Sequence, residues 1–473
     1  MVNLAFSATV QRFVYMTYSA LLTTDPGTCQ FPTLGFVVDR YFRVKNFVPE
    51  PFWSIKVTHR RDEMDVNFSW ARNRLFDRAV VIIIYERCLA AKKASVSKIQ
   101  ERPTKKWKPL PLTTVEFQKM ASRMLRINSS EAMSIAETLY QKGFISYPRT
   151  ETDRFDRGMD LRALCTKQIQ DNHWGPFAND LVNNGKFQQP REGRNDDKAH
   201  PPIHPVQYVN ASALNANERK VYELITRRFL ACCSEDAKGQ STTVTITYGS
   251  EDFSATGLVV LERNYLEVYP YENWHSSAML PRFQLGEQFE PTEAMMNEGN
   301  TSPPHHLTEA DLIALMDANG IGTDATMAEH IQKIQERDYV ITANRGESNH
   351  GSNNRGPARG AARGVRGNAR GGRGGAANDA ANGGGGGSGN AVFLPTTLGM
   401  ALVDGYDKME FEPALHKPFL RKEMELKMKD ICAGRLTKSD MVRDCVRQYK
   451  AVFEQSEERL DVLKAVSPYC FVV

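Results

Sequence analysis

The sequence predicts a multidomain α+β protein in which a helical lobe is inserted into a β-rich lobe. Three observations lead to this prediction. The 473 residues are enough for about three domains, strand-like runs occur on both sides of a central stretch, and helix start signals gather within that stretch. No run of 18 apolar residues occurs, so we expect no membrane span.

The β-rich lobe is predicted from short apolar runs separated by turn residues. Between residues 31 and 91 the strand-like runs are FWSIKV, VNFSW and AVVIIIY, and between residues 241 and 266 they are STTVTITYG and FSATGLVVL. Runs of this length, rich in β-branched and aromatic residues, are typical of strands. We therefore expect the chain to visit one β-rich lobe twice.

Helix signals fill the stretch between these visits and return after it. TTVEFQKMASRML opens with the capping pair Thr113 and Glu116, and NSSEAMSIAETLYQKG runs from an Asn128 cap to Gly143. After residue 304 a helix capped by Thr308, a glycine turn and a second helix are predicted, and residues 417–464 read as long charged helices.

A glycine- and arginine-rich stretch interrupts the later part of the chain. Between residues 341 and 390 lie seven arginines, no lysine, two acids and 16 of the 33 glycines. Such a composition buries too little apolar surface to offset the entropy of ordering, so we predict a disordered insertion. The flanking runs ERDYVI and AVFLPTTLGMALV are strand-like, and we expect them to form two arms of one hairpin.

The cysteines give no sign of a metal site. The eight cysteines include no C-x-x-C pair, and no signal peptide opens the chain. This pattern favours reduced, intracellular thiols, and we predict that the chain itself binds no metal.

The stretch GFISYPRTETDRF holds the first candidate for chemistry. Gly143 ends a helix and Pro148 favours extended backbone, so Tyr147 is presented on a stiff connector. One interpretation is a half-buried aromatic that covers the helix end; the other is a nucleophile, which needs help with its proton and with the charge on its target. Arg149, on the same side of an extended segment, suits phosphate oxygens, although an ion pair with Glu151 or Asp153 is the alternative.

Two further stretches are candidates for phosphate binding. In DDKAHPPIHP the prolines exclude a helix, so His200 and His204 are better placed to donate hydrogen bonds to phosphate than to bind a metal; an extended surface segment is the alternative. GIGTDAT is a glycine turn that leads into a helix, with Thr323 or Asp324 as its cap and free N–H groups that suit a phosphate. An ordinary helical hairpin has the same sequence pattern.

These motifs, taken together, resemble the type IA DNA topoisomerases, and most closely the eukaryotic topoisomerase III alpha group. The resemblance runs from about residue 27 to residue 453, apart from the glycine-rich insertion. Its main motifs are CQFPTLGFVVDR, FVPEPFWSIKVTH, ASRMLRINSSEAMSIAETLYQKGFISYPRTETDRF, AHPPIHP and SPPHHLTEADLIALMDANGIGTDATMAEHIQKIQERDYV.

The resemblance implies roles for these residues. A tyrosine in the position of Tyr147 attacks one DNA strand and becomes linked to its 5′-phosphate, Arg149 lies at the scissile phosphate, and His200 joins the hydrogen bonds around it. The residues implied along the single-strand path are Gln30, Gly320, Gly322, Thr323, Asp324 and Thr326. In the insertion we expect nucleic-acid contacts from Arg355, Arg359, Arg363, Arg366, Arg370 and Arg373.

The resemblance also implies a torus built from numbered domains. The predicted ranges are 1–30 as a remnant of domain IV, 31–107 and 234–304 as the two parts of domain II, 108–233 as domain III with the tyrosine, 305–342 as helices of domain IV, 343–390 as the insertion, and 391–473 as the C-terminal helices of domain IV.

The resemblance further concerns cofactors and activity. Family members carry a Toprim domain with a catalytic glutamate and with an acidic D-x-D-x-E cluster that holds Mg²⁺, and no D-x-D occurs in this sequence. We expect that these residues lack the Toprim domain and the C-terminal zinc ribbons, and that Mg²⁺ belongs to the complete enzyme. No G-x-x-x-x-G-K-[ST] motif occurs, in keeping with ATP-independent chemistry.

Two functions remain open at this point. The first is a topoisomerase that relaxes or decatenates DNA, for recombination and repair, through a 5′-phosphotyrosyl intermediate; the second is a catalytically silent remnant that binds single-stranded DNA or RNA. The resemblance suggests a RecQ-type helicase and a small OB-fold protein as partners. It favours the nucleus, with the mitochondrion as the alternative compartment.

Overall fold

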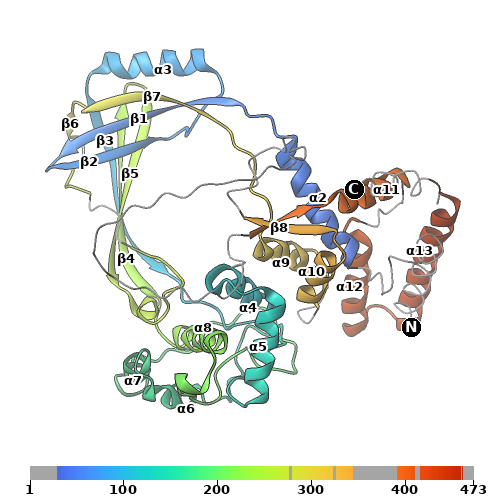
Figure 1. Ribbon diagram of the computed structural model, residues 1–473. Helices are drawn as coiled ribbons and strands as arrows, with labels where there is room; N and C mark the ends of the chain where they lie inside the picture. Colours follow the sequence, from blue (N-terminus) through green and yellow to red (C-terminus); the bar gives the residue numbers. More distant parts are fainter. Residues whose placement is uncertain are drawn as a thin grey trace, which may run out of the picture.

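The protein is built from three lobes that follow one another around a ring (Figure 1). The computed structural model describes residues 29–275, 280–322, 326–344, 391–410, 416–459 and 461. Within these residues each lobe has its own core of buried apolar side chains: a β-rich lobe, a helical lobe, and a third lobe of mixed composition.

The β-rich lobe is one sheet of seven strands with the order β6-β3-β4-β5-β2-β1-β7. Its strands are β1 (Pro51–Arg61), β2 (Met64–Trp70), β3 (Ala94–Lys106), β4 (Ala237–Tyr248), β5 (Glu251–Glu262), β6 (Gln288–Phe289) and β7 (Glu293–Asn300). Strands from both visits of the chain are neighbours in this order, because β3 pairs with β4 and β2 pairs with β5. The prediction of two visits to one β-rich lobe is therefore confirmed.

The prediction that AVVIIIY forms a strand of this lobe is wrong. AVVIIIY lies in the helix α3 (Arg78–Ala91), which covers one face of the sheet (Figure 1). Asp77 starts the helix, since its carboxylate accepts hydrogen bonds from the N–H groups of Ala79 and Val80. A continuous apolar run fits a strand or a buried helix equally well, and here the packing of Val81 and other side chains on the sheet decides for the helix.

The helical lobe lies between β3 and β4 in the sequence. Its helices are α4 (Thr114–Met120), which continues as a π-helical turn at Ala121–Leu125, α5 (Ser129–Gln141), α6 (Leu161–Lys167), α7 (Gly175–Asn183) and α8 (Ala216–Cys232). The predicted caps Thr113 and Asn128 are confirmed, because each side chain accepts the backbone N–H three residues later.

The third lobe brings together segments that are far apart in the sequence. It contains α2 (Gln30–Lys45), α9 (Glu309–Ala318), α10 (Met327–Glu336), β8 (Val340–Asn344), β9 (Ala391–Pro395) and α11 (Thr397–Lys408). β8 and β9 pair from Val340 opposite Pro395 to Asn344 opposite Ala391, which confirms the predicted hairpin. Residues 345–390, which include the arginines predicted to bind nucleic acid, lie outside the described residues.

The helix α2 corrects a predicted domain range. Residues 31–45 were expected to open the β-rich lobe, but they form a helix whose buried side includes Leu34, Val37 and Val38. These side chains pack in the core of the third lobe, so the β-rich lobe begins with β1. The other predicted domain boundaries stay predictions.

Two charged helices follow the third lobe. These are α12 (Phe419–Cys432) and α13 (Lys438–Glu458), which share a small core of Met424, Met441 and Cys445.

Among the described residues, no helix is long and apolar enough to cross a membrane.

A polar contact joins the helical lobe to the third lobe. Oε1 of Glu309 at the start of α9 accepts hydrogen bonds from N (2.9 Å) and Oγ (2.6 Å) of Ser129 at the start of α5, and both residues are buried. Nearby, Arg123 forms an ion pair of 3.2 Å with Asp311. This contact closes the ring beside the segment that carries Tyr147.

Candidate active site around Tyr147

Tyr147 lies on a connector that two neighbouring segments hold in place. Gly143 ends α5 with φ of +77°, a backbone conformation that favours glycine, and the chain then runs beside residues 193–206. Hydrogen bonds link the two segments, including N–H of Ser146 to the carbonyl oxygen of His204 and N–H of Val206 to that of Phe144, both at 2.9 Å. The connector is thus fixed by its backbone, and the Tyr147 side chain is half-buried upon it.

The phenol ring of Tyr147 stands between two other rings. The ring centroid of His200 lies 4.7 Å away at an interplanar angle of 41°. The ring of Tyr140, on the last turn of α5, packs edge-on at 5.3 Å and is 43% exposed. His200 is thus brought next to the predicted nucleophile by a loop more than 50 residues further along the chain.

Arg149 is held at the same place by carboxylates from two lobes. Its Nε donates to Oε1 of Glu137 on α5 at 2.7 Å, and its Nη2 lies 2.5 Å from the same oxygen. Its Nη1 lies 3.9 Å from Oε1 of Glu329, in the first turn of α10. The predicted alternative partner Asp153 is wrong, because its carboxylate accepts from the N–H and side-chain amide of Asn195 instead.

The two histidines of DDKAHPPIHP have different surroundings. His204 is 3% exposed, its Nδ1 lies 2.7 Å from the carbonyl oxygen of Pro202, and burial lowers its pKa. The His200 side chain is 43% exposed and faces Tyr147. Only His200 is therefore placed to contact a phosphate at the tyrosine; His204 is part of the core of the helical lobe.

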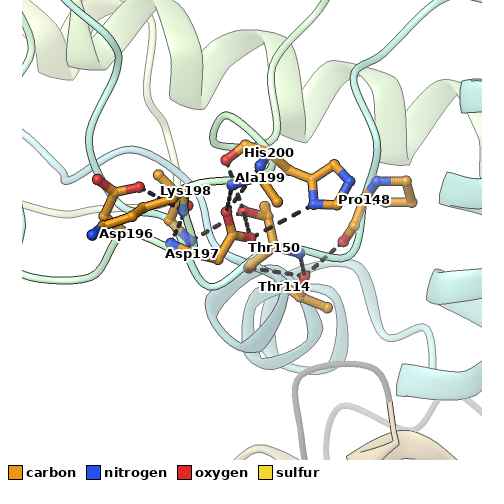
Figure 2. Close-up of polar contacts among 9 residues, drawn as sticks. Thr114, Pro148, Thr150, Asp196, Asp197, Lys198, Ala199 and His200 are labelled. Atoms are coloured by element: carbon orange, nitrogen blue, oxygen red, sulfur yellow. Dashed lines mark hydrogen bonds and ion pairs between the residues drawn. The ribbon is translucent and has the colours of Figure 1, made fainter. Parts of the chain in front are cut away.

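Asp197 organises the loop that carries His200 (Figure 2). Its Oδ1 accepts the backbone N–H groups of Ala199 (2.8 Å) and His200 (2.9 Å), and its Oδ2 accepts the hydroxyl of Thr150 at 3.2 Å. Partial burial favours the neutral carboxyl, but these hydrogen bonds, with that of Thr152, outweigh it and lower the pKa of Asp197 to about 2. The carboxylate is therefore ionised at neutral pH, with Oδ2 3.7 Å from Nδ1 of His200.

The hydroxyl of Thr114 continues this network to the backbone on both sides of Arg149. It donates to the carbonyl oxygen of Pro148 at 2.7 Å and accepts the N–H of Thr150 at 2.7 Å (Figure 2). Thr114 is fully buried at the start of α4. The first turn of α4 therefore sets the path of the chain that follows Tyr147.

The predicted glycine turn lies close to this group of residues. Gly320 and Gly322 have φ of +65° and +80°, so both positions favour glycine. The helix α10 begins with Thr326 in the N-cap position, which corrects the predicted cap at Thr323 or Asp324; those two residues lie outside the described part of the chain. The ion pair between Glu329 and Arg149 brings the first turn of α10 towards Tyr147.

Gln30 lies at the start of α2, in the third lobe. It is 2% exposed, and its Oε1 accepts a hydrogen bond of 2.5 Å from Nη1 of Arg337. A DNA contact by this side chain requires that it first become exposed, so its role on the single-strand path stays a prediction.

The carboxylates of the site form ion pairs and hydrogen bonds and do not form one cluster of acidic side chains. No group of three or more His, Cys, Asp or Glu side chains within the described residues could hold a metal ion. At Tyr147 the described carboxylates of Glu137 and Glu329 pair with Arg149, and that of Asp197 accepts backbone N–H groups.

Several residues of the site escaped the sequence analysis. Asp197 carries a signal, since an Asp three residues before a histidine on a proline-rich loop suits a local side-chain cap of the loop. Glu329 carries none, because a contact between lobes brings it to Arg149 from a distant part of the sequence. Glu137 and Tyr140 lie on α5, just before Tyr147 in the sequence, but their contacts depend on how the turn after Gly143 directs the connector.

Comparisons with known proteins agree with this architecture. A family model described as DNA topoisomerase matches residues 4–350. The DNA topoisomerase 3 of Schizosaccharomyces pombe is 46% identical over 439 residues, which cover 93% of this chain and 64% of that protein. The DNA topoisomerase 3-alpha of Homo sapiens is 45% identical over 428 residues, which cover 90% of this chain and 38% of that protein. The chain thus spans less than two thirds of the length of these relatives.

A solved structure shares the ring. The full-length topoisomerase I of Thermotoga maritima superposes with a TM-score of 0.68 at 20% identity, over 96% of this chain and 69% of that one. The fold is therefore that of the type IA topoisomerases. The chain belongs to the DNA topoisomerase family, and among its members it is similar to the eukaryotic topoisomerases 3 and 3-alpha.

Proposed function

We propose that the protein is an ATP-independent type IA DNA topoisomerase of the topoisomerase III kind, with Tyr147 as its nucleophile. It cuts one DNA strand, lets another strand pass and reseals the cut, and so relaxes or decatenates DNA. The observation that carries the proposal is the position of the Tyr147 ring, 4.7 Å from His200 and on the same connector as Arg149. Membership of the DNA topoisomerase family supports it.

The proposed reaction is a transesterification, in which one phosphorus–oxygen bond forms as another breaks. The phenol oxygen of Tyr147 forms a bond to phosphorus as the bond to the 3′ oxygen breaks; the phenol loses its proton and the 3′ oxygen gains one. A 5′-phosphotyrosyl ester and a free 3′-hydroxyl result. Because one phosphate ester replaces another, resealing is the reverse step and no ATP is consumed.

Each residue has a physical task in this proposal. Arg149 presents a planar guanidinium to the phosphate oxygens, for which it must exchange the carboxylate of Glu137 for the incoming phosphate. His200 donates a hydrogen bond to the same phosphate. The ordered connector keeps Tyr147 in place while the ring opens, and its backbone hydrogen bonds to residues 193–206 support this rigidity.

The proposal is tested with a single-stranded oligonucleotide, Mg²⁺ and a separately expressed Toprim domain from a relative. With a 3′-labelled strand we expect label on the protein, whereas a 5′ label leaves on a shorter strand. Tyr147→Phe abolishes the adduct but not strand binding, because only the attacking oxygen is lost. The matched control is Tyr140→Phe, which retains the adduct.

The outcomes separate the two functions. An adduct with the Tyr147→Phe chain contradicts the nucleophile assignment, and attachment to the 3′ end contradicts the type IA mechanism. Strand binding without any adduct in every mixture favours the silent nucleic-acid-binding remnant. In a reaction to which no Toprim domain is added, we expect residues 1–473 to bind strands but not to relax supercoiled DNA.

We propose the wider setting from family resemblance. It comprises single-stranded DNA, with RNA as an alternative, a RecQ-type helicase and an OB-fold protein as partners, and the nucleus rather than the mitochondrion. Affinity purification of the tagged protein followed by mass spectrometry, together with imaging of the tag, tests these points. The absence of both partners, or a mitochondrial signal alone, contradicts them.

A further inference from the structure

We infer that Asp197 is a positioning residue that orients the imidazole of His200 against Tyr147 and the bound phosphate. The inference rests on the proposed function of the site and assigns a role to a residue that does not itself touch the phosphate. Figure 2 shows the contacts of Asp197 with Thr150, Ala199 and His200.

The two carboxylate oxygens of Asp197 have separate tasks. Oδ1 accepts both N–H groups of the turn that leads to the histidine, those of Ala199 and His200. Oδ2 accepts the hydroxyl of Thr150 and lies 3.7 Å from Nδ1 of His200. One oxygen therefore fixes the backbone of the loop, while the other faces the imidazole ring.

This arrangement selects which ring nitrogen faces the DNA. The partner of one imidazole nitrogen decides where the proton resides, since a carboxylate beside Nδ1 favours a proton on that atom. When the ring carries both protons, Nδ1–H points to Oδ2 and Nε2–H, at the far side of the ring, is left to donate to the phosphate. A distance of 3.7 Å is longer than a hydrogen bond, so a ring movement of about 1 Å completes the contact when a strand binds.

Asp197 also couples this loop to the connector of Tyr147. The hydroxyl of Thr150 joins Asp197, and the N–H of Thr150 donates to Thr114, which in turn holds the carbonyl oxygen of Pro148, directly after Tyr147. A shift of the Asp197 carboxylate therefore changes the spacing of both rings. The backbone N–H of Asp197 adds a link of 3.1 Å to the hydroxyl of Thr152.

Asp197→Asn separates this role from that of a loop cap. The Asn side chain has the same shape, and its oxygen still accepts the N–H groups of Ala199 and His200. Its NH₂ group replaces Oδ2 and cannot accept a hydrogen bond from Nδ1–H of His200. The matched control is Asp196→Asn, which removes the neighbouring charge; Asp196 pairs with Arg154 and caps the N–H of Lys198 instead.

The first measurement needs no catalysis. With ¹³C-labelled histidine and tyrosine rings, the nuclear Overhauser effect between the rings of His200 and Tyr147 reports their contact, and His200→Gln assigns the signal. We expect Asp197→Asn to weaken this effect at least about twofold while the other histidine signals keep their positions, and Asp196→Asn to leave it unchanged. An unchanged ring contact in Asp197→Asn overturns the inference.

The second measurement uses the Toprim-supplemented protein in a single turnover. We expect Asp197→Asn to slow adduct formation by about 10- to 100-fold, the loss of one hydrogen bond to a charged group, with oligonucleotide affinity within about twofold. Equal losses of affinity and rate, or a full rate, contradict the positioning role. If no wild-type adduct forms, the proposed function fails while the ring contact still decides the role of Asp197.

Discussion

Glu309 offers the most direct test of how the ring is held closed. Its carboxylate comes from the third lobe and accepts two hydrogen bonds from Ser129, at the N-terminus of α5 in the helical lobe. A carboxylate at this position both replaces a missing intrahelical acceptor and lies at the positive end of the helix. Glu309→Ala removes this contact across the lobes.

The expected magnitude follows from the geometry. A hydrogen bond to a charged group contributes about 1.5–3 kcal/mol, and the charge at a helix N-terminus adds about 0.3–1 kcal/mol. We therefore expect Glu309→Ala to weaken the lobe contact by about 3 kcal/mol, which is roughly a 100-fold change in its opening equilibrium. Glu309→Gln keeps an acceptor oxygen and loses only the charge, so its effect is about 1 kcal/mol.

Amide hydrogen exchange across the start of α5 is the assay. Glu309→Ala should speed the exchange of the Ser129 and Ser130 amides, and the exchange rates in Glu309→Gln should lie between those of Glu309→Ala and wild type. A double-mutant cycle with Ser129→Ala isolates the hydrogen bond from the Ser129 hydroxyl, because the backbone N–H remains, and a coupling of at least about 1 kcal/mol is expected. If exchange at α5 stays at the wild-type rate in Glu309→Ala, or if only α9 loosens, the contact does not hold the two lobes together.

Three further predictions concern other parts of the chain. Residues 345–390 can be replaced by an Asn-Gly turn between Asn344 and Ala391, and the melting temperature should then stay unchanged. The slope of log affinity for single strands against log salt concentration should become less steep by about 3–5, because the seven arginines are lost. A large loss of stability would show that the insertion packs. Gly35→Ala should lower the free energy of unfolding of the third lobe by about 1–3 kcal/mol, since a Cβ would lie 2.1 Å from the carbonyl oxygen of His416, and a melting temperature within a degree of wild type contradicts this. Because the pKa of Asp197 is lowered to about 2, its charge stabilises the fold by at most about 2 kcal/mol above pH 4, and this contribution is lost as the pH falls through 2. Wild type and Asp197→Asn should therefore differ in thermal unfolding at pH 5 and converge near pH 2, and a constant difference contradicts the assignment.

The sequence alone determined the elements whose signals are local. The caps Thr113, Asn128 and Thr308, the glycine at 143 and the short runs FWSIKV and VNFSW predicted those helices and strands, because each depends on neighbours a few residues away. The motif around Tyr147 was equally local. Its resemblance to a known family gave the fold class and led to the candidate residues.

Only the tertiary structure decided which segments pack together and which side chains meet. AVVIIIY forms a helix because its buried side chains pack on the sheet. The helix α2 belongs to the third lobe because its apolar side packs in a core made from residues hundreds of positions later. His200 meets Tyr147, and Arg149 meets Glu329 of the third lobe, through contacts between distant segments. Such contacts carry no local signal, since their free energy comes from burial and pairing that exist only once the lobes have folded around the ring.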